Sequence, residues 1–123
     1  MNTMKNVAAC VLMLCMGSIV SADTISWDAR KPAVMVTLIN GVPVYSADCS
    51  GPLSMTAGNK AEYLFRKSGT NDAWRSGGVN VTNGTWAGTL AAGGKWEIKP
   101  VIKDGTGKII AEGAVKTADI PVN

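Results

Sequence analysis

The side-chain types in this 123-residue chain restrict the chemistry that it could perform. The chain contains no histidine, which excludes Ser-His-Asp and Cys-His nucleophiles, imidazole general bases and histidine-bearing zinc sites. A pair drawn from the nine carboxylates is the one remaining route to hydrolysis, as in glycosidases. No acidic cluster, Walker loop or dinucleotide fingerprint accompanies them. We therefore expect no enzyme, no catalytic residue, no cofactor and no metal site.

A tryptophan and an arginine that are adjacent in a polar segment are the candidates for ligand contact. Trp74 and Arg75 lie in Ser68–Gly77, whose Gly, Ser, Asn and Asp content predicts a loop. An exposed aromatic ring beside a cation is typical of a contact with carbohydrate or protein. The alternative is that Trp74 folds back as a lid over the end of the domain.

The first 22 residues predict a secretory signal peptide. Lys5 is a lone cation, an apolar run extends from Val7 to Val20, and Ser21-Ala22 supplies small residues before Asp23. The apolar run is short for a transmembrane helix. We expect cleavage before Asp23, export to the periplasm, cell surface or medium, and one domain over residues 23–123 without a transmembrane span.

Removal of this leader changes both the charge and the cysteine count. Without Lys5, 11 of the 12 cations remain against 9 anions, and they are scattered, so a nucleic-acid partner is not expected. Cys10 and Cys15 also leave with the leader, and Cys49 alone cannot form an internal disulfide. We expect Cys49 to be buried, since free cysteine is among the most buried residue types. Pairing with another chain is the alternative.

The rest of the chain has the pattern of a β protein. Short runs rich in Val, Ile and Thr alternate with turn signals about every 8–12 residues, which predicts an all-β sandwich or barrel. Asn40-Gly41 and Asn83-Gly84 predict two-residue hairpins, because both residue types tolerate positive φ. Among the predicted strands are Ala33–Ile39, Val42–Ser46, Lys60–Arg66, Gly78–Thr82, Thr85–Leu90, Lys95–Lys103 and Lys108–Val115.

Alternation of side chains assigns the strand faces. Trp86 and Trp96 share their faces with other apolar residues, so we expect both in the core. Ala33–Ile39 is apolar on both faces, which predicts a strand in the middle of the fold. Proline cannot donate to a ladder, so Pro43 and Pro100 are expected on edge strands or at bulges.

A second segment, besides Ser68–Gly77, is predicted to be a loop. Ala47–Asn59 contains Cys49, Pro52 and two glycines, and it predicts a loop. With this loop set aside, the remaining runs favour an immunoglobulin-like antiparallel β-sandwich of seven or eight short strands.

A family resemblance supports this fold. The segments Asn83–Leu90, Gly93–Trp96 and Val101–Asp104 resemble the second half of bacterial immunoglobulin-like domains, with a Gly-Thr-Trp strand, a glycine turn, a long strand and an Asp-Gly hairpin. A Trp-x-Gly strand near the C-terminus is also similar to that of fimbrial subunits. The resemblance to subunits of chaperone–usher fimbriae implies an incomplete sandwich that receives an N-terminal strand from the next subunit.

The N-terminal segment has the alternation that such a donor strand needs. Ile25, Trp27 and Ala29 alternate with polar or charged residues. These three are the candidate strand-donor residues, and their side chains would fill pockets in a neighbour. The alternative is an ordinary first strand in the chain's own sheet.

We therefore expect an exported bacterial structural or adhesion subunit of the fimbrial type. It would assemble by strand addition, and its partners would be proteins, either further subunits or a chaperone. The alternative is a stand-alone secreted or periplasmic β-sandwich that binds carbohydrate or protein.

Overall fold

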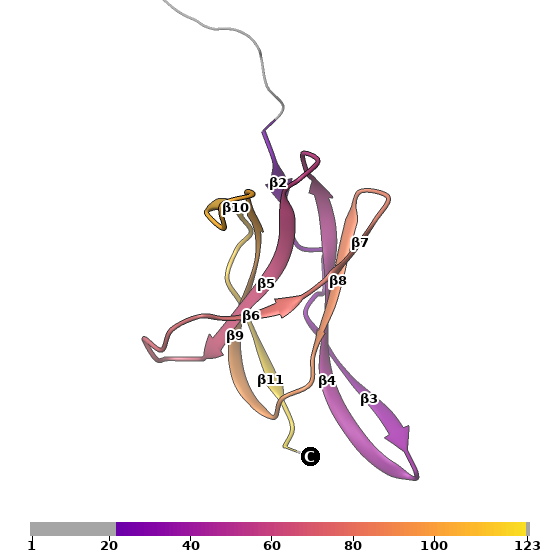
Figure 1. Ribbon diagram of the computed structural model, residues 1–123. Helices are drawn as coiled ribbons and strands as arrows, with labels where there is room; N and C mark the ends of the chain where they lie inside the picture. Colours follow the sequence, from indigo (N-terminus) through magenta and orange to yellow (C-terminus); the bar gives the residue numbers. More distant parts are fainter. Residues whose placement is uncertain (1–21, 123) are drawn as a thin grey trace, which may run out of the picture.

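The computed structural model describes residues 22–122, which form two antiparallel β-sheets packed face to face (Figure 1). These residues contain no helix. The predicted signal peptide, apart from its last residue Ala22, lies outside the described residues.

The first sheet is built around one long strand. Its members are β2 (Thr24–Ile25), β3 (Ala33–Ile39), β4 (Val42–Ser54), β7 (Asn80–Thr82) and β8 (Thr85–Leu90). The order is β2-β4-β8-β7, and β3 lies beside β4 on the same edge as β2. Thus β2 pairs with the end of β4, β3 pairs with its beginning, and β8 takes the other edge from residue 47 to residue 52.

In the second sheet, too, two short strands pair one after the other with the same edge of a long strand. Its members are β5 (Lys60–Lys67), β6 (Arg75–Gly78), β9 (Gly94–Lys103), β10 (Ile109–Glu112) and β11 (Lys116–Ile120). The order is β10-β9-β5-β6. β10 and β11 pair with successive halves of β9, on the edge away from β5.

This connectivity is that of an immunoglobulin sandwich, with strand order A-B-E-D in one sheet and C′-C-F-G in the other. The predicted fold class is confirmed. Residues 22–122 contain ten strands because the first and last strands of the sandwich are each interrupted, giving β2 with β3 and β10 with β11; with each of these pairs counted as one strand, the number is eight.

The core lies between the two sheets and consists of the inward-facing side chains of both. Trp86 and Trp96 are buried there, as their alternation predicted, together with Ile98, Ile102 and Ile120. Burial of the indoles leaves their N–H groups in need of acceptors. Trp86 Nε1 donates to the Ser26 carbonyl at 2.8 Å, and Trp96 Nε1 donates to the Ala92 carbonyl at 2.9 Å.

Both predicted hairpin turns are confirmed. Asn40 and Gly41 have φ of 52° and 78°, and Asn83 and Gly84 have φ of 51° and 77°. Two successive positive φ values define a type I′ turn, whose twist matches that of the strands it joins. The first turn joins β3 to β4, and the second joins β7 to β8.

Three expectations about individual segments are wrong. Ala33–Ile39 is an edge strand with exposed side chains, and not a central strand. Ala47–Asn59 is not a loop, since β4 continues through Cys49 to Ser54. The predicted loop Ser68–Gly77 ends earlier, because Arg75 begins β6. Pairing with β8 and β5 supplies the backbone partners that composition did not indicate.

The prolines occupy positions where an N–H is not required. Pro43 lies in β4 before β8 begins to pair, so its nitrogen is on a free edge. Pro100 lies within the inner strand β9, at the break between β10 and β11. Its carbonyl accepts from Gly113 N on that side at 2.8 Å, so its nitrogen faces the same break.

Candidate functional site

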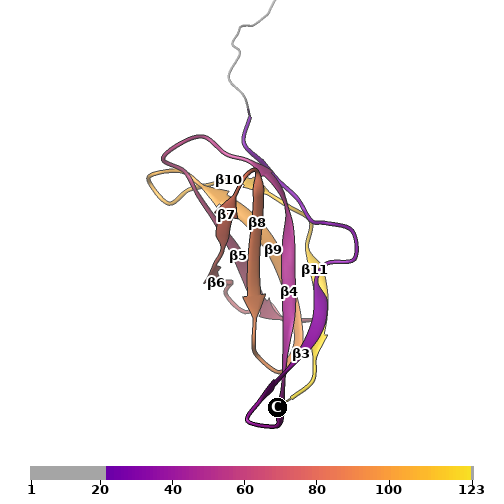
Figure 2. The same ribbon diagram turned by 90° about the vertical axis from the view of Figure 1, so that its right-hand side faces the viewer.

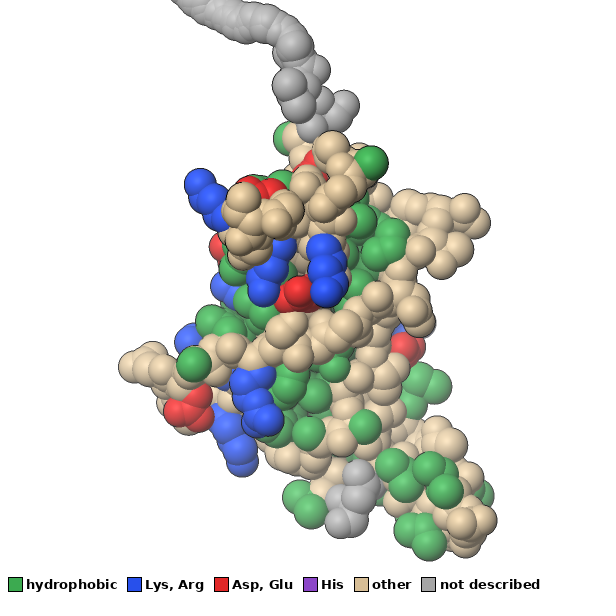
Figure 3. All heavy atoms as spheres, in the orientation of Figure 1, with side chains coloured by type: hydrophobic (Ala, Val, Ile, Leu, Met, Phe, Trp, Pro, Cys, Tyr) green, Lys and Arg blue, Asp and Glu red, His purple; other side chains and the backbone are tan. Residues whose placement is uncertain are grey.

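An apolar hairpin projects from one end of the sandwich. It consists of β3, the Asn40-Gly41 turn and the first part of β4, and it extends past the second sheet (Figure 1). Leu38 is 70% exposed and Val36 is 54% exposed. The other exposed large apolar residues of this hairpin are Val34, Met35, Ile39 and Val42. The space-filling view shows hydrophobic side chains gathered on this projection (Figure 3).

The register of the hairpin determines which backbone groups face outward. The turn residues are flanked by the pair Ile39 and Val42, which in a two-residue hairpin exchange both N–H···O bonds. Pairs then alternate along an antiparallel ladder. Val34, Val36 and Leu38 therefore direct their N–H and C=O groups away from β4. No strand within residues 22–122 pairs with this outer edge of β3.

The outer edge of β3 lacks the features that normally prevent edge pairing. Natural edge strands are protected by charges, prolines or bulges. Residues 32–47 contain no charged side chain, and the two flanking charges, Lys31 and Asp48, form an ion pair with each other. The hairpin's proline, Pro43, protects the opposite edge, since its nitrogen points away from β3.

The exposed apolar surface is continuous with the core. Val34 pairs with Ala47, which is fully buried, so Val34, Val36 and Leu38 lie on the core-facing side of the first sheet. β11 approaches β3 at this corner of the sandwich without pairing with it (Figure 2). The hairpin tip extends beyond the opposite sheet (Figure 1), and the core-facing side chains Val36 and Leu38 are exposed.

The candidate strand-donor residues lie in the chain's own sandwich. Ile25 is buried in the core, and Trp27 is half-buried with its ring 5.3 Å from that of Trp86. Trp27 Nε1 donates to the Ala114 carbonyl at 2.7 Å. Ala29 is exposed in a turn and does not share their environment. In this conformation the segment forms the first strand of its own sheet.

Asp23 fixes the beginning of this segment. Its Oδ1 accepts hydrogen bonds from Thr56 N at 3.1 Å and Thr56 Oγ1 at 2.7 Å, and its Oδ2 accepts from Asn59 Nδ2 at 2.7 Å. The hydroxyl of Thr56 and the amide of Asn59 lower the pKa of the Asp23 carboxyl. The ionised carboxylate therefore holds β2 against the connection between β4 and β5.

The structure does not bring Trp74 and Arg75 into one contact surface. Trp74 is half-buried on the outer face of the second sheet, where the Arg66 guanidinium lies 4.2 Å and Lys99 Nζ 4.8 Å from its ring centroid. Arg75 begins β6 and points to the other face, with its guanidinium 5.5 Å from the Phe65 ring. Trp74 thus contacts two cations of its own sheet.

The charges on this outer face neutralise one another. Arg66 Nε lies 2.9 Å from Glu97 Oε1, and Lys99 Nζ lies 2.8 Å from Glu112 Oε1. The hydrogen bond from Arg66 is the main cause that lowers the pKa of the Glu97 carboxyl. Because these cations and anions pair with one another, the outer face is a solvated surface of mixed charge.

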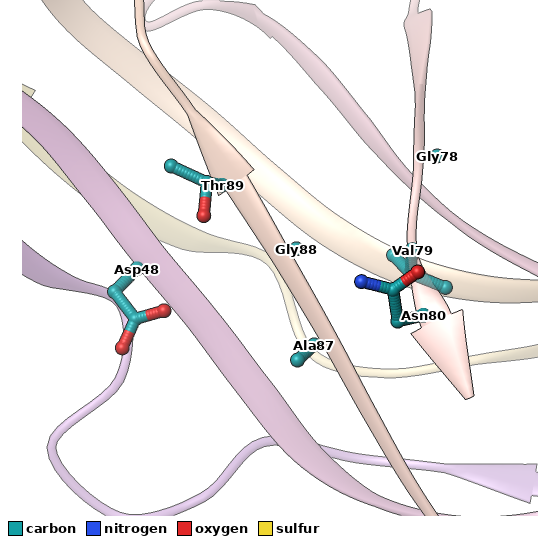
Figure 4. Close-up of a pocket in the computed structure, with 7 residues that line it drawn as sticks. All are labelled: Asp48, Gly78, Val79, Asn80, Ala87, Gly88 and Thr89. Carbon is teal, nitrogen blue, oxygen red and sulfur yellow. The ribbon is translucent and has the colours of Figure 1, made fainter. Parts of the chain in front are cut away.

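A separate polar groove of about 370 Å³ lies beside β8 and is lined by residues of β4, β6, β7 and β8 and by Val79. Figure 4 shows Asp48 and Thr89 side by side on neighbouring strands, with Asn80 on the far side of Ala87 and Gly88. Asp48 forms the ion pair with Lys31 described above, and Trp74 and Arg75 do not line the groove. The three polar side chains offer donors and acceptors to a hydroxylated ligand.

Cys49 is fully buried and free, so its predicted burial is confirmed. Desolvation raises the pKa of its thiol to about 12, and the nearby Asp48 carboxylate acts in the same direction. The thiolate is the reactive form of cysteine. The native fold therefore keeps Cys49 as an unreactive thiol.

The exposed edge of β3 is the feature that the sequence prediction missed. An apolar run on both faces is expected of a buried strand and equally of a strand that another chain covers. The signal that distinguishes them is the absence of charge from residue 32 to residue 47, which continues through the Asn-Gly turn that must lie at the surface.

Residues 22–122 contain no helix able to cross a membrane and no cluster of His, Cys, Asp or Glu able to hold a metal ion. No protein-family model, no curated protein and no solved structure matches the chain.

Proposed function

We propose that this protein is an exported structural or adhesion subunit that joins other protein chains by strand addition at the outer edge of β3. The observation that carries the proposal is the uncharged, exposed edge formed by Val34, Val36 and Leu38. Strand addition obtains affinity from main-chain hydrogen bonds and specificity from alternate side chains. The β3 edge supplies both.

The N-terminal segment takes a different role in this proposal from that of a fimbrial donor strand. Ile25 and Trp27 complete the chain's own first sheet, and the last sandwich strand is supplied by β10 and β11 of the same chain. The sandwich of residues 22–122 thus has no missing strand of its own to be replaced. The edge that invites a partner is β3, which acts as an acceptor of an extended strand.

Assembly in an exporting cell tests this function. The full chain with its leader is produced in a bacterial host, and envelope fractions are separated by native electrophoresis with detection of the protein. The wild type should occur in assemblies larger than the monomer. A Val36→Ser/Leu38→Ser double variant should migrate as a monomer, because it weakens the apolar edge.

The control is Ile110→Ser, which changes an exposed apolar residue on β10 in the other sheet. It should assemble as the wild type does. Equal assembly of the wild type and the double variant would contradict the proposal, as would equal loss in the control.

The polar groove favours a second candidate, a binding module for carbohydrate. Asp48, Asn80 and Thr89 present polar groups in a depression of about 370 Å³, within the range of ligand sites. Titration with neutral oligosaccharides, followed by amide NMR shifts, should then perturb the groove residues in the wild type and not in Asn80→Ala. Unchanged spectra across the panel would remove this candidate.

A further inference from the structure

We infer that the strand added to β3 is β3 of a second copy, paired antiparallel about a twofold axis at Val36. This inference rests on the proposed function and specifies its partner. Three observations carry it: the direction of the free backbone groups, the distribution of charge and the shape of the hairpin.

The backbone geometry selects one register. The outward-facing residues are Val34, Val36 and Leu38, spaced two apart and symmetric about the middle one. Antiparallel pairing that places Val36 opposite itself also places Val34 opposite Leu38 of the second copy, and the reverse. All three outward-facing residues of each strand are then in hydrogen-bonded pairs, which gives about six N–H···O bonds between the chains. A shift of two residues in either direction leaves one of the three outside these pairs.

The side chains agree with this register. Val36 faces its own copy, and Val34 faces Leu38, so each cross-strand pair joins β-branched or aliphatic groups. Met35 falls opposite Thr37 on the other face. A twofold contact of this kind uses one edge from each copy and closes, so no free β3 edge remains.

The distribution of charge makes this edge a place where a second copy can approach. Residues 23–123 carry 11 cations and 9 anions, so two identical chains repel weakly in general. The hairpin carries no charge over residues 32–47, and Lys31 and Asp48 at its base neutralise each other. In the proposed register Lys31 lies opposite Gly41 of the second copy, so no like charges are brought together. Two copies of this neutral edge therefore meet without an electrostatic penalty.

The shape of the molecule permits the contact. The hairpin extends beyond the second sheet, so two hairpins can lie side by side while the two sandwiches stay on opposite sides of the axis (Figures 1 and 2). β11 approaches β3 only at this corner and forms no ladder with it. The exposed residues Val36 and Leu38 then gain a neighbour along their free side.

The first test is the mass of the processed chain purified from exporting cells. Sedimentation or light scattering over a range of concentrations should show a monomer–dimer equilibrium. Val36→Lys should weaken the dimer by about tenfold or more, because it sets two ammonium groups directly opposite each other. Met35→Lys is the matched control, since it lies on the same strand, faces the other side and is not on the axis.

The second test is a cross-link that only the proposed register allows. Hydrogen-bonded antiparallel neighbours have Cα atoms about 5.5 Å apart, but their Cβ atoms are farther apart than an unstrained disulfide requires. Val36→Cys should therefore be linked to the same residue of the second copy by a short bifunctional maleimide. Leu38→Cys faces Val34 of the second copy and should link much more slowly. The native Cys49 is buried and does not compete.

These results separate the inference from the function on which it rests. A monomer at every concentration, or equal cross-linking of Val36→Cys and Leu38→Cys, overturns the twofold pairing. If envelope assembly still depends on Val36 and Leu38 in that case, strand addition stands and the partner is a different chain. If envelope assembly is also insensitive to these residues, both proposals fail.

Discussion

The indole of Trp27 stands edge-on against that of Trp86, with ring centroids 5.3 Å apart and ring planes inclined by 68°. The same Trp27 donates through Nε1 to the carbonyl of Ala114, which lies between β10 and β11. The N-terminal segment therefore packs on the core and also forms a hydrogen bond to the connection between β10 and β11 of the second sheet. This contact closes the sandwich at the edge where its first and last strands meet.

Truncating Trp27 should destabilise the isolated domain. Trp27→Ala removes a half-buried indole and its hydrogen bond, and we expect a loss of about 2 kcal/mol in the free energy of unfolding. Trp27→Phe keeps a ring against Trp86 and should lose about half as much. Urea denaturation followed by Trp fluorescence measures both. An unchanged midpoint for Trp27→Ala would show that the segment does not contribute to its own fold.

A glycine allows this segment to approach the first sheet. A Cβ at Gly51 would lie 1.9 Å from the Ser26 carbonyl oxygen, the atom that accepts the Trp86 N–H. Gly51→Ala should push the segment away from β4 and cost about 2–4 kcal/mol, the range of overpacking and a lost buried hydrogen bond. Gly78→Ala is the matched control, because nothing lies within 4 Å of its Cβ and its φ is not positive. Equal midpoints in thermal unfolding would contradict this account.

Truncation of two tryptophans should differ in its cost to stability. Trp86→Ala removes a fully buried ring and should cost about 3–5 kcal/mol. Trp74→Ala removes a half-buried ring on the outer face, held by Arg66 and Lys99, and should cost about 1 kcal/mol or less. Chemical denaturation of both variants checks the contrast. A larger loss for Trp74→Ala than for Trp86→Ala would mean that the outer face is part of the core.

Local chemistry made much of the fold predictable. Asn-Gly pairs require positive φ at both residues, so the turns at residues 40–41 and 83–84 follow from residue type. Alternation over Thr85–Leu90 and over the first half of β9 predicts the buried tryptophans from the sequence alone. These features depend on contacts within one hairpin or one strand.

The remaining features depend on partners that are distant in sequence. β4 runs through Gly51 and Pro52 because β2 and β8 supply its ladders there, and nothing within the segment indicates this. The place of β3 at the edge depends on which strand lies beyond it, and its apolar character fits both a buried and a covered strand. The sequence did not predict the exposed β3 edge because the apolar run of this strand fits a buried position equally well.

Cys49 should react only when the domain opens. Its side chain is buried and its thiol pKa is raised to about 12, so the thiolate is scarce and inaccessible in the native state. Labelling with a thiol reagent should be at least about a hundredfold slower than for the same chain in urea, and its rate should follow the unfolding equilibrium. Trp27→Ala should accelerate it in proportion to its loss of stability. Rapid labelling in native buffer would mean that Cys49 is accessible without unfolding.

Acid should destabilise the domain in part through Glu62. Ser76 Oγ donates to Glu62 Oε1 at 2.6 Å, and Lys103 Nζ lies 2.9 Å from the same oxygen. The hydroxyl first, and then the ammonium, lower the pKa of this carboxyl in the folded state. A lowered folded pKa gives stability that is complete above the unfolded value of about 4.3 and is lost as the pH falls through the folded pKa. Glu62→Gln should therefore be less stable than the wild type at pH 7, and the difference should vanish in strong acid.

Salt separates the contact of Glu62 with Lys103 from its contact with Ser76. Lys103→Met removes only the ammonium, and added salt should reduce its effect because the ion pair is partly exposed. Ser76→Ala removes the hydroxyl, and its effect should be larger and almost independent of salt, since this hydrogen bond is the first cause of the shift. Unfolding free energies at pH 3, 5 and 7, at low and high salt, distinguish the two. If Ser76→Ala leaves the pH dependence unchanged while Lys103→Met removes it, the carboxylate is held by charge alone and the hydroxyl has no part in it.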